Sequence, residues 1–427
     1  MKKKQLRWTL WTIASPFILF IILCILIYLP PIQNFLVDKA AVYASEATGM
    51  NISVGRISLS FPLNLVVTDV DAASPHKDTL LSVRRLQVNV QLLPLLKKQV
   101  EVDGISLQGA TVNSNDLIHG MRLNGTLGEL FISSHGVALD PETAIVNKVL
   151  LKDTDLSLCL NDTAAADTAA SDPTYWKIIL QDIDLQNVSF ALDMPLDSLS
   201  LAASLDNATL RDGLIDLHKS AYSLQTFRIK NGRVRYDSGR PSATASADSL
   251  SAGLDPSHIA LTDIGVKLDS LYYEGRNMKA VISQFVLKER SGVEIVSTEG
   301  RLVSNDKVLR VPSLKLETRD SYLELNAAMD WDALDFKKEG LVSARLMADI
   351  GKPDVVRFMG SMDEKFIRKY PSEPLRIRTG IDGDLNKLKL TTLTAELPGA
   401  LELFAKGELT SLTDSLLRGG DITLQAE

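Results

Sequence analysis

Cysteine, histidine and aromatic residues are all scarce in this sequence. Its 427 residues include two cysteines and five histidines, and aromatics make up only 6%. Cys24 lies in an apolar N-terminal run and Cys159 far away in the body, so we expect no disulfide framework. The net charge of −7 argues against nucleic acid as a partner. The body must therefore gain its stability from sheet hydrogen bonds and apolar burial.

Motifs of catalysis and metal binding are missing as well. The histidines show no H-x-x-x-H spacing, and there is no G-x-S-x-G, Walker A or Rossmann glycine pattern. The segment 382–386 begins like a calcium loop, but Lys387 stands where glycine is required and Leu393 where the closing glutamate belongs. Asp182 and Asp184 could form a carboxylate pair, although they alternate along a predicted strand next to solvent. We expect no enzyme, no cofactor and no metal.

The N-terminus has the pattern of a membrane anchor. A basic tail, residues 1–7, precedes residues 8–29, which carry no charged side chain and would span about 33 Å as a helix. The anchoring aromatic residues are Trp8, Trp11, Phe17, Phe20 and Tyr28. The positive-inside rule places the N-terminus in the cytoplasm and the body on the far side, in the periplasm.

Two processed forms are alternatives to a retained anchor. A signal peptide also begins with a basic and an apolar region, but no small-x-small cleavage site directly follows Leu29. A lipoprotein site at Cys24 needs a small residue before the cysteine, where Leu23 stands. We therefore expect a single-pass, uncleaved inner-membrane anchor.

After the anchor, helical spacing gives way to strand spacing. Residues 32–49 predict an amphipathic helix that stops at Gly49. From Ile52 onward, apolar and polar residues alternate with period two, as in half-buried strands; clear cases begin at Ile57, Leu86, Ile295 and Leu314. Short helices are expected only near 353–359 and 363–370, with Pro353 suited to a helix start.

One strand pattern recurs. Alternating apolar residues meet an Asp or Asn step, at 103, 153, 187 and 231, after which the alternation resumes on the opposite parity. A bulge or bend at each step would keep the apolar side chains on one face. The candidate lining residues of this face are Val100, Val102, Ile105, Leu107, Val149, Leu151, Leu156, Leu158, Ile183, Leu185, Val188 and Phe190.

The body divides at a stretch without periodicity. Residues 50–160 form a first β region, residues 161–173 an exposed loop, and residues 174–427 a continuing β region. The alternation from Gly420 to Glu427 has no stop signal, so we expect the sheet to continue beyond the end of this sequence.

The order of segments in the first 110 residues resembles the start of the TamB/AsmA-like proteins of Gram-negative bacteria. The resemblance rests on the anchor, the helix ending EATGM at 46–50, and the segments VGRISL at 54–59, DTLLSVRRLQV at 78–88, LLPLLKK at 92–98 and VEVDGISL at 100–107. It implies an elongated, curved antiparallel sheet, folded as a U-shaped trough with an apolar lining.

The same resemblance implies a function in envelope biogenesis. Such proteins conduct phospholipid between the inner and outer membranes, and the TamB branch is linked to outer-membrane protein assembly. The implied partners are the inner membrane, phospholipid acyl chains and an outer-membrane β-barrel of the BamA/TamA type. Two alternatives remain open: a non-catalytic docking scaffold that pairs with another protein's strand, and an anchored hydrolase.

Short Asp-Ser/Thr motifs are a separate feature. They resemble the O-glycosylation acceptors of exported Bacteroidetes proteins, and Thr163 and Thr168 in the expected loop are the best candidates. Solvated turns are the alternative reading of these motifs.

Overall fold

The structure is a computed structural model. It describes residues 39, 41, 42, 45, 46, 49–60, 64–74, 79–91, 102–114, 120–138, 142–161, 175–239, 253–334, 338, 340–359, 364–384, 386–412 and 419–426. The predicted tail 1–7 and transmembrane helix 8–29 lie outside these residues, as do most of the helix 32–49 and the loop 161–173. Among the residues described, no helix has the length and apolar character needed to cross a membrane.

The described chain is mainly β, as predicted, with two groups of strands. The first compact unit holds β1 (Asn51–Ser60), β2 (Asn64–Ala73), β3 (Thr79–Val90), β4 (Val102–Asn113), β5 (Met121–Ala138) and most of β6 (Thr143–Leu160). The second unit holds β7 (Lys177–Met194), β8 (Leu199–Asp216), β9 (Ala221–Leu224), β10 (Thr226–Ser238), β11 (His258–Glu274), β12 (Asn277–Glu289), β13 (Glu294–Ser304), β14 (Val308–Thr318), β15 (Tyr322–Asp330), β16 (Leu341–Ile350), β17 (Leu375–Asp384), β18 (Lys387–Leu397), β19 (Leu401–Thr410) and β20 (Gly419–Ala426).

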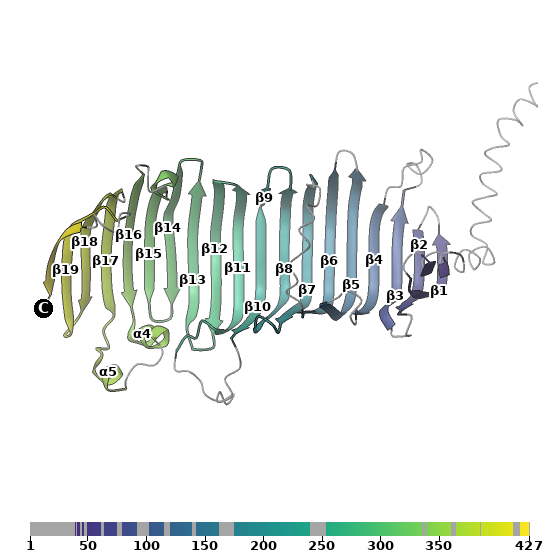
Figure 1. The fold of residues 1–427 in the computed structure, drawn as a ribbon, viewed down its shortest axis with the longest axis horizontal. Helices are drawn as coiled ribbons and strands as arrows, with labels where there is room; N and C mark the ends of the chain where they lie inside the picture. The colour runs from purple at the N-terminus through teal and green to yellow at the C-terminus, as the bar shows by residue number, and fades with distance from the viewer. Residues whose placement is uncertain are drawn as a thin grey trace, which may run out of the picture. The chain divides into compact units, whose positions relative to one another are not determined.

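Consecutive strands pair antiparallel within each unit (Figure 1). In the first unit β1 to β5 form a meander in sequence order. In the second unit β8 is followed by β10 and the short β9, which lie end to end between β8 and β11. From β11 to β20 each strand again pairs with the next. This order follows from tight connections, because short turns join antiparallel neighbours.

Helices are few in the described part of the second unit. Helix α4 (Lys352–Met359) and helix α5 (Glu364–Lys369) lie in the connection between β16 and β17, and the 3-10 helix η1 (Trp331–Leu334) follows β15. Both short helices agree with the sequence prediction, and Pro353 lies in the first turn of α4, where no N–H is needed. Figure 1 shows them at the ends of the strands.

The predicted strand irregularities are confirmed at all four steps. Asp153, Asn187 and Asn231 have positive φ angles of 50°, 51° and 52° inside strands β6, β7 and β10. At Asp103 the register shifts, because Asn89 pairs with Gly104 and Val90 with Val102, so Asp103 is an extra residue. Four more left-handed positions within strands were missed: Asp69, Gly109, Asp212 and Asp263.

The glycines that follow two of these steps, Gly104 and Gly232, do not supply the left-handed conformation. Neither Gly104 nor Gly232 has a positive φ; the left-handed residues are Gly109 in β4 and Asn231 in β10. Asn tolerates this conformation better than most residues. Gly104 and Gly232 are instead crowded: an added Cβ would lie 3.1 Å from the Ile132 oxygen or from the Ile264 Cβ.

Candidate functional site: the apolar face

The strongest candidate site is one face of the sheet in the second unit. Residues directly opposite each other in paired strands have side chains on the same face, so the register shows which side chains form rows. Across β14 to β20 four such rows contain apolar residues or glycine, with Thr379 the one exception. The rows are Leu316–Leu323–Ala348–Ile377–Ala395–Leu403–Ala426, Leu314–Leu325–Leu346–Thr379–Leu393–Ala405–Leu424, Val311–Ala327–Ala344–Ile381–Leu390–Gly407–Ile422 and Leu309–Met329–Val342–Gly383–Leu388–Leu409–Gly420.

Rows of the same kind cross β7 to β12 and include four of the predicted lining residues. They are Ile183–Leu210–Phe227–Leu268–Ile282, Leu185–Ala208–Ile229–Val266–Phe285, Val188–Leu205–Gly232–Ile264 and Phe190–Ala203–Val234–Leu261. In β13, between the two sets, Gly300 pairs with Ile282 and Leu314, while the polar Thr298 and Ser304 lie opposite Leu316 and Leu309. Ile183 and Leu185 lie on one side of the left-handed Asn187, and Val188 and Phe190 on the other. The bend thus resets the alternation so that all four residues join apolar rows. We call these rows of the second unit the apolar face.

The first unit repeats this arrangement by itself. Its rows are Ile57–Val67–Leu86–Leu107–Leu130, Leu65–Val88–Ile105–Ile132, Val54–Val70–Val83–Ala110–Leu127 and Ile52–Ala72–Leu81–Val112–Gly125. The predicted residues Ile105 and Leu107 belong to them, and Val102 pairs with Val90. Val149, Leu151, Leu156 and Leu158 are half-buried in β6, on either side of Asp153. Val100 lies outside the described residues.

The apolar face is only partly buried. The fully buried apolar residues of the second unit that lie on it are mostly alanines, such as Ala208, Ala348 and Ala405, at 2–3% exposure. Larger side chains are open to solvent: Phe190 is 38% exposed, Ile422 47% and Leu424 61%. A face packed under a second layer would bury its large side chains first. Among the described residues, the helices lie at the strand ends and do not form such a layer (Figure 1).

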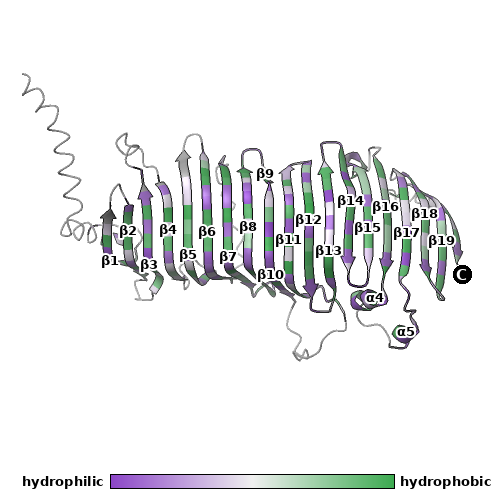
Figure 2. Cartoon of the chain, turned by 180° about the vertical axis from the view of Figure 1, so that it is seen from behind, coloured by the Kyte–Doolittle hydropathy of each residue, from purple (hydrophilic) through white to green (hydrophobic). Residues whose placement is uncertain are grey.

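The opposite face of the second unit is polar. Ion pairs join neighbouring strands there, with an Arg378–Asp349 distance of 2.7 Å, Lys387–Glu408 of 3.4 Å and Arg376–Glu396 of 3.7 Å. Figure 2 shows the resulting alternation of hydrophilic and hydrophobic residues along the strands. These exposed pairs add little stability, but they keep this face in water.

One end of the apolar face is lined by tyrosines. Tyr222 in β9 pairs with Tyr273 in β11, and their ring centroids are 6.1 Å apart. Both rings are partly exposed. Tyrosine suits such a position because its ring is apolar and its hydroxyl remains hydrated. This pair was not predicted, although Tyr272-Tyr273 within an alternating segment is a visible signal.

The residues considered for chemistry have structural roles. Asp182 and Asp184 both bind the Arg211 guanidinium, Asp184 at 3.0 Å, so the carboxylate pair is neutralised by one cation. Asp384 accepts hydrogen bonds from the backbone N–H groups of Asn386 and Lys387 at 2.7 and 2.8 Å, as expected for a turn. Among the described residues, no group of His, Cys, Asp or Glu has the arrangement of a metal site.

A hollow on the polar face is the other candidate surface. Its volume is about 390 Å³, and its lining includes Glu299, Arg301, Lys315 and Ser283. Glu299 and Lys315 lie opposite each other in paired strands and offset each other's charge. Ser283 in its lining donates a hydrogen bond to the exposed Asp269 carboxylate, a contact between surface side chains that by itself indicates no catalytic arrangement.

The remaining sequence predictions fall on undescribed residues: the anchoring aromatics Trp8, Trp11, Phe17, Phe20 and Tyr28, and the glycosylation candidates Thr163 and Thr168. No known family model matches the sequence, and no curated protein matches it.

Proposed function

We propose that this chain is an AsmA/TamB-like protein of the cell envelope that conducts phospholipid along its apolar face. In this proposal residues 8–29 hold it in the inner membrane, and the β body lies in the periplasm as a curved, trough-like sheet. The chain is a non-catalytic conduit whose partners are the inner membrane and acyl chains. An outer-membrane β-barrel, and a role in the assembly of outer-membrane proteins, belong to the same proposal.

The observation that carries the proposal is the extent of the apolar face. From β14 to β20 the four rows cover on the order of 600 Å², at about 4.8 Å between strands and about 6.8 Å between rows. Monomeric proteins rarely expose more than a few hundred Å² of continuous apolar surface. A surface of this size needs an apolar occupant.

Acyl chains fit this need better than a protein strand does. A strand would bind the sheet through backbone hydrogen bonds at an edge, whereas the uncovered surface consists of side chains across a face. Each methylene that leaves water contributes about 0.8 kcal/mol. Sliding along rows of Leu, Val, Ile and Ala breaks no hydrogen bond, so a chain can bind strongly in total and still move.

Photo-crosslinking in the envelope would test the proposal. A benzophenone amino acid at Phe190 or Leu346 is expected to capture phospholipid, because both positions belong to apolar rows. The matched positions Ser189 and Arg345 are on the other parity and should capture none. Capture of protein alone at Phe190 and Leu346 would support the docking scaffold, and equal lipid capture at all four positions would refute the proposed surface.

A charge in the face supplies an independent test. Leu346→Asp is expected to stop lipid transfer, because a charge among acyl chains is costly. Met347→Asp places the same charge one residue away, on the polar face, and should leave transfer intact. If both variants fold, as judged by circular dichroism, and transfer equally well, the apolar face is not the path.

A further inference from the structure

The connection between β16 and β17 differs from its neighbours. Most connections from β11 to β19 are tight turns, whereas this one runs from Gly351 to Pro374 and contains α4 and α5. A connection of this length is uncommon between neighbouring strands of one sheet. The meander itself does not need these helices, because two antiparallel strands can be joined by two residues.

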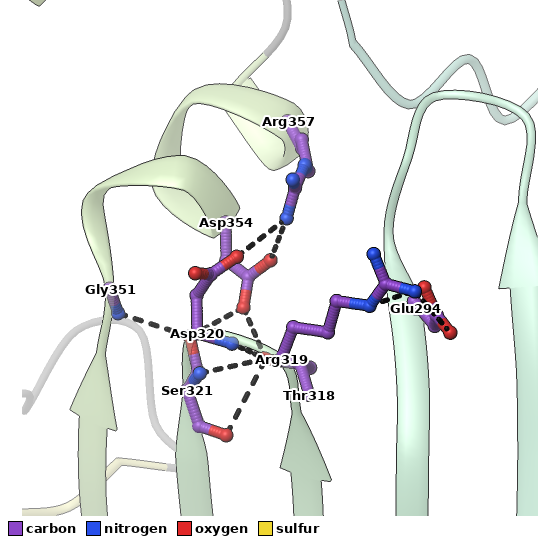
Figure 3. A network of polar contacts seen from close by, with 8 residues as sticks. All are labelled: Glu294, Thr318, Arg319, Asp320, Ser321, Gly351, Asp354 and Arg357. Carbon is purple, nitrogen blue, oxygen red and sulfur yellow. Dashed lines mark hydrogen bonds and ion pairs between the residues drawn. The ribbon is translucent and has the colours of Figure 1, made fainter.

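Helix α4 is pinned to the ends of β14 and β15 by a buried carboxylate (Figure 3). Asp354 is 0% exposed and accepts hydrogen bonds from Thr318 Oγ1 and, at 2.6 Å, from Ser321 Oγ. Its other oxygen binds Arg357, 3.0 Å away, which also binds Asp320 at 2.9 Å. The Gly351 N–H donates to Ser321 Oγ at 3.1 Å.

The charges in this cluster offset one another. Burial lowers the pKa of the Arg357 guanidinium, but hydrogen bonds to Asp320 and Asp354 outweigh burial and leave that pKa above its usual value. Lys352 Nζ also donates a hydrogen bond to the Tyr370 carbonyl oxygen at 2.8 Å, which joins the start of α4 to the end of α5. These contacts hold both helices at the strand ends.

This fixed element presents apolar and basic side chains to solvent. Phe358 is 52% exposed, Met359 63% and Phe366 52%. In α5, Lys365, Arg368 and Lys369 recur at helical spacing and are exposed, against one acidic residue, Glu364. The Phe366 and Tyr370 rings, four residues apart, are 6.1 Å apart and form the adjacent stripe.

We propose that α4 and α5 form a contact element for the surface of an anionic phospholipid membrane. An exposed Phe beside Lys and Arg, as Phe366 is in α5, is the combination found in interfacial helices, where apolar side chains enter the headgroup region and cations meet lipid phosphates. The charge selects anionic lipid over a neutral surface. The inference does not depend on lipid transport, because it uses only the β16–β17 connection.

A fluorescent reporter at Phe366 would test it. The full chain, with Cys24→Ala and Cys159→Ala, is held in phosphatidylcholine nanodiscs and carries NBD on Phe366→Cys. Vesicles of phosphatidylcholine with phosphatidylglycerol are expected to shift the emission to the blue and raise it several-fold. Pure phosphatidylcholine vesicles should have little effect. The same dye on Arg310→Cys, on the polar face of β14, should not respond.

Two variants separate a lipid contact from an unspecific effect. The triple variant K365E/R368E/K369E is expected to weaken binding at least tenfold, while K279E/R310E/K315E on the polar face makes the same charge change without loss. Phe358→Ser with Met359→Ser keeps every charge and should also reduce the signal. Circular dichroism verifies the fold of each.

The proposal is overturned if the Phe366 reporter responds to neither vesicle, which would assign this surface to a protein or a second copy. It is equally overturned if the serine variant binds like the unmodified chain. Because lipid capture at Phe190 is measured separately, failure here is distinguishable from failure of the proposed conduit.

Discussion

Two regions of the second unit build the same apolar face in different ways. Strands β7, β8 and β11 have 17 or 18 residues and carry left-handed residues in their interior, at Asn187, Asp212 and Asp263. Strands β14 to β20 have 8 to 11 residues; the alternation is unbroken in most of them, but register shifts in β14, between Val311 and Leu314, and in β18, between Leu390 and Leu393, change its parity. The parity is therefore reset in two ways in this unit: by a left-handed residue inside β7, β8 and β11, and by a register shift in β14 and β18.

The two regions also differ in what holds them. In β7 to β11 the distinctive features lie inside the strands, as where Asn231 Nδ2 donates to Asp206 Oδ2 at 3.0 Å. In β14 to β17 they lie at the strand ends, where Asp354 ties α4 to two strands. Substitutions in the two places should have different consequences.

Removal of the buried carboxylate should have the largest effect. Asp354→Ala removes the shared acceptor of the Thr318 and Ser321 hydroxyls, while Arg357 keeps its ion pair with Asp320. A hydrogen bond to a charged group contributes about 1.5–3 kcal/mol, so the two lost bonds together are expected to cost roughly 3–5 kcal/mol. Urea unfolding, with hydrogen exchange of α4, measures it. As a control, Asp332→Ala removes the exposed ion pair between Asp332 and Lys338 and should cost at most about 1 kcal/mol. Equal losses would mean that α4 is not pinned by Asp354.

A β-branched residue at a bend is expected to cost less. Asn187→Val and Asn231→Val force valine into φ near 50°, at about 1–3 kcal/mol each in denaturant unfolding. Thr394→Val in β18, at a position without a positive φ, has nearly the same shape and should stay within about 0.5 kcal/mol. If neither valine substitution lowers the free energy of unfolding, the left-handed residues are not what resets the parity.

Gly232→Val separates crowding from conformation. Its Cβ would lie 3.1 Å from the Ile264 Cβ, so overpacking of about 1–3 kcal/mol is expected. The combination with Ile229→Ala, which removes the Cγ2 that would lie 3.2 Å from the new Cβ, should recover part of the loss relative to Ile229→Ala alone. A loss that the second substitution leaves unchanged would point to backbone strain.

The smallest effect concerns pH. The Glu289 carboxyl lies at the turn between β12 and β13. Burial raises its pKa, but hydrogen bonds from Ser291 and Ala260 lower the pKa by more, so the net pKa is below its ordinary value. Because the pKa of Glu289 is lower in the folded state than in the unfolded state, its charge stabilises the fold at pH values above the unfolded pKa, near 4.5. This stabilisation is lost as the pH falls through the pKa of the folded state. Glu289→Gln should therefore flatten the decline of the melting temperature below pH 5. An unchanged slope would contradict the assignment.

Much of the local structure could be predicted from the sequence. Alternation is a local property, so the segments at Leu86, Ile295 and Leu314 were recognised as strands, and Pro353 indicated the start of α4. The parity change at Asn187 also predicted its bend. Asp212 and Gly109 were missed because the residues around them read as ordinary strand.

The apolar character of the face was determined by the sequence, since each strand has its own alternation. Its continuity was decided by tertiary structure alone, because a row such as Leu316 to Ala426 depends on six registers, and a one-residue slip in any of them would turn a strand's apolar side to water. The role of Asp354 was likewise set by folding. In sequence it is an ordinary acidic residue in the first turn of a helix, and only the approach of Thr318 and Ser321 from a distant turn makes it a buried tie.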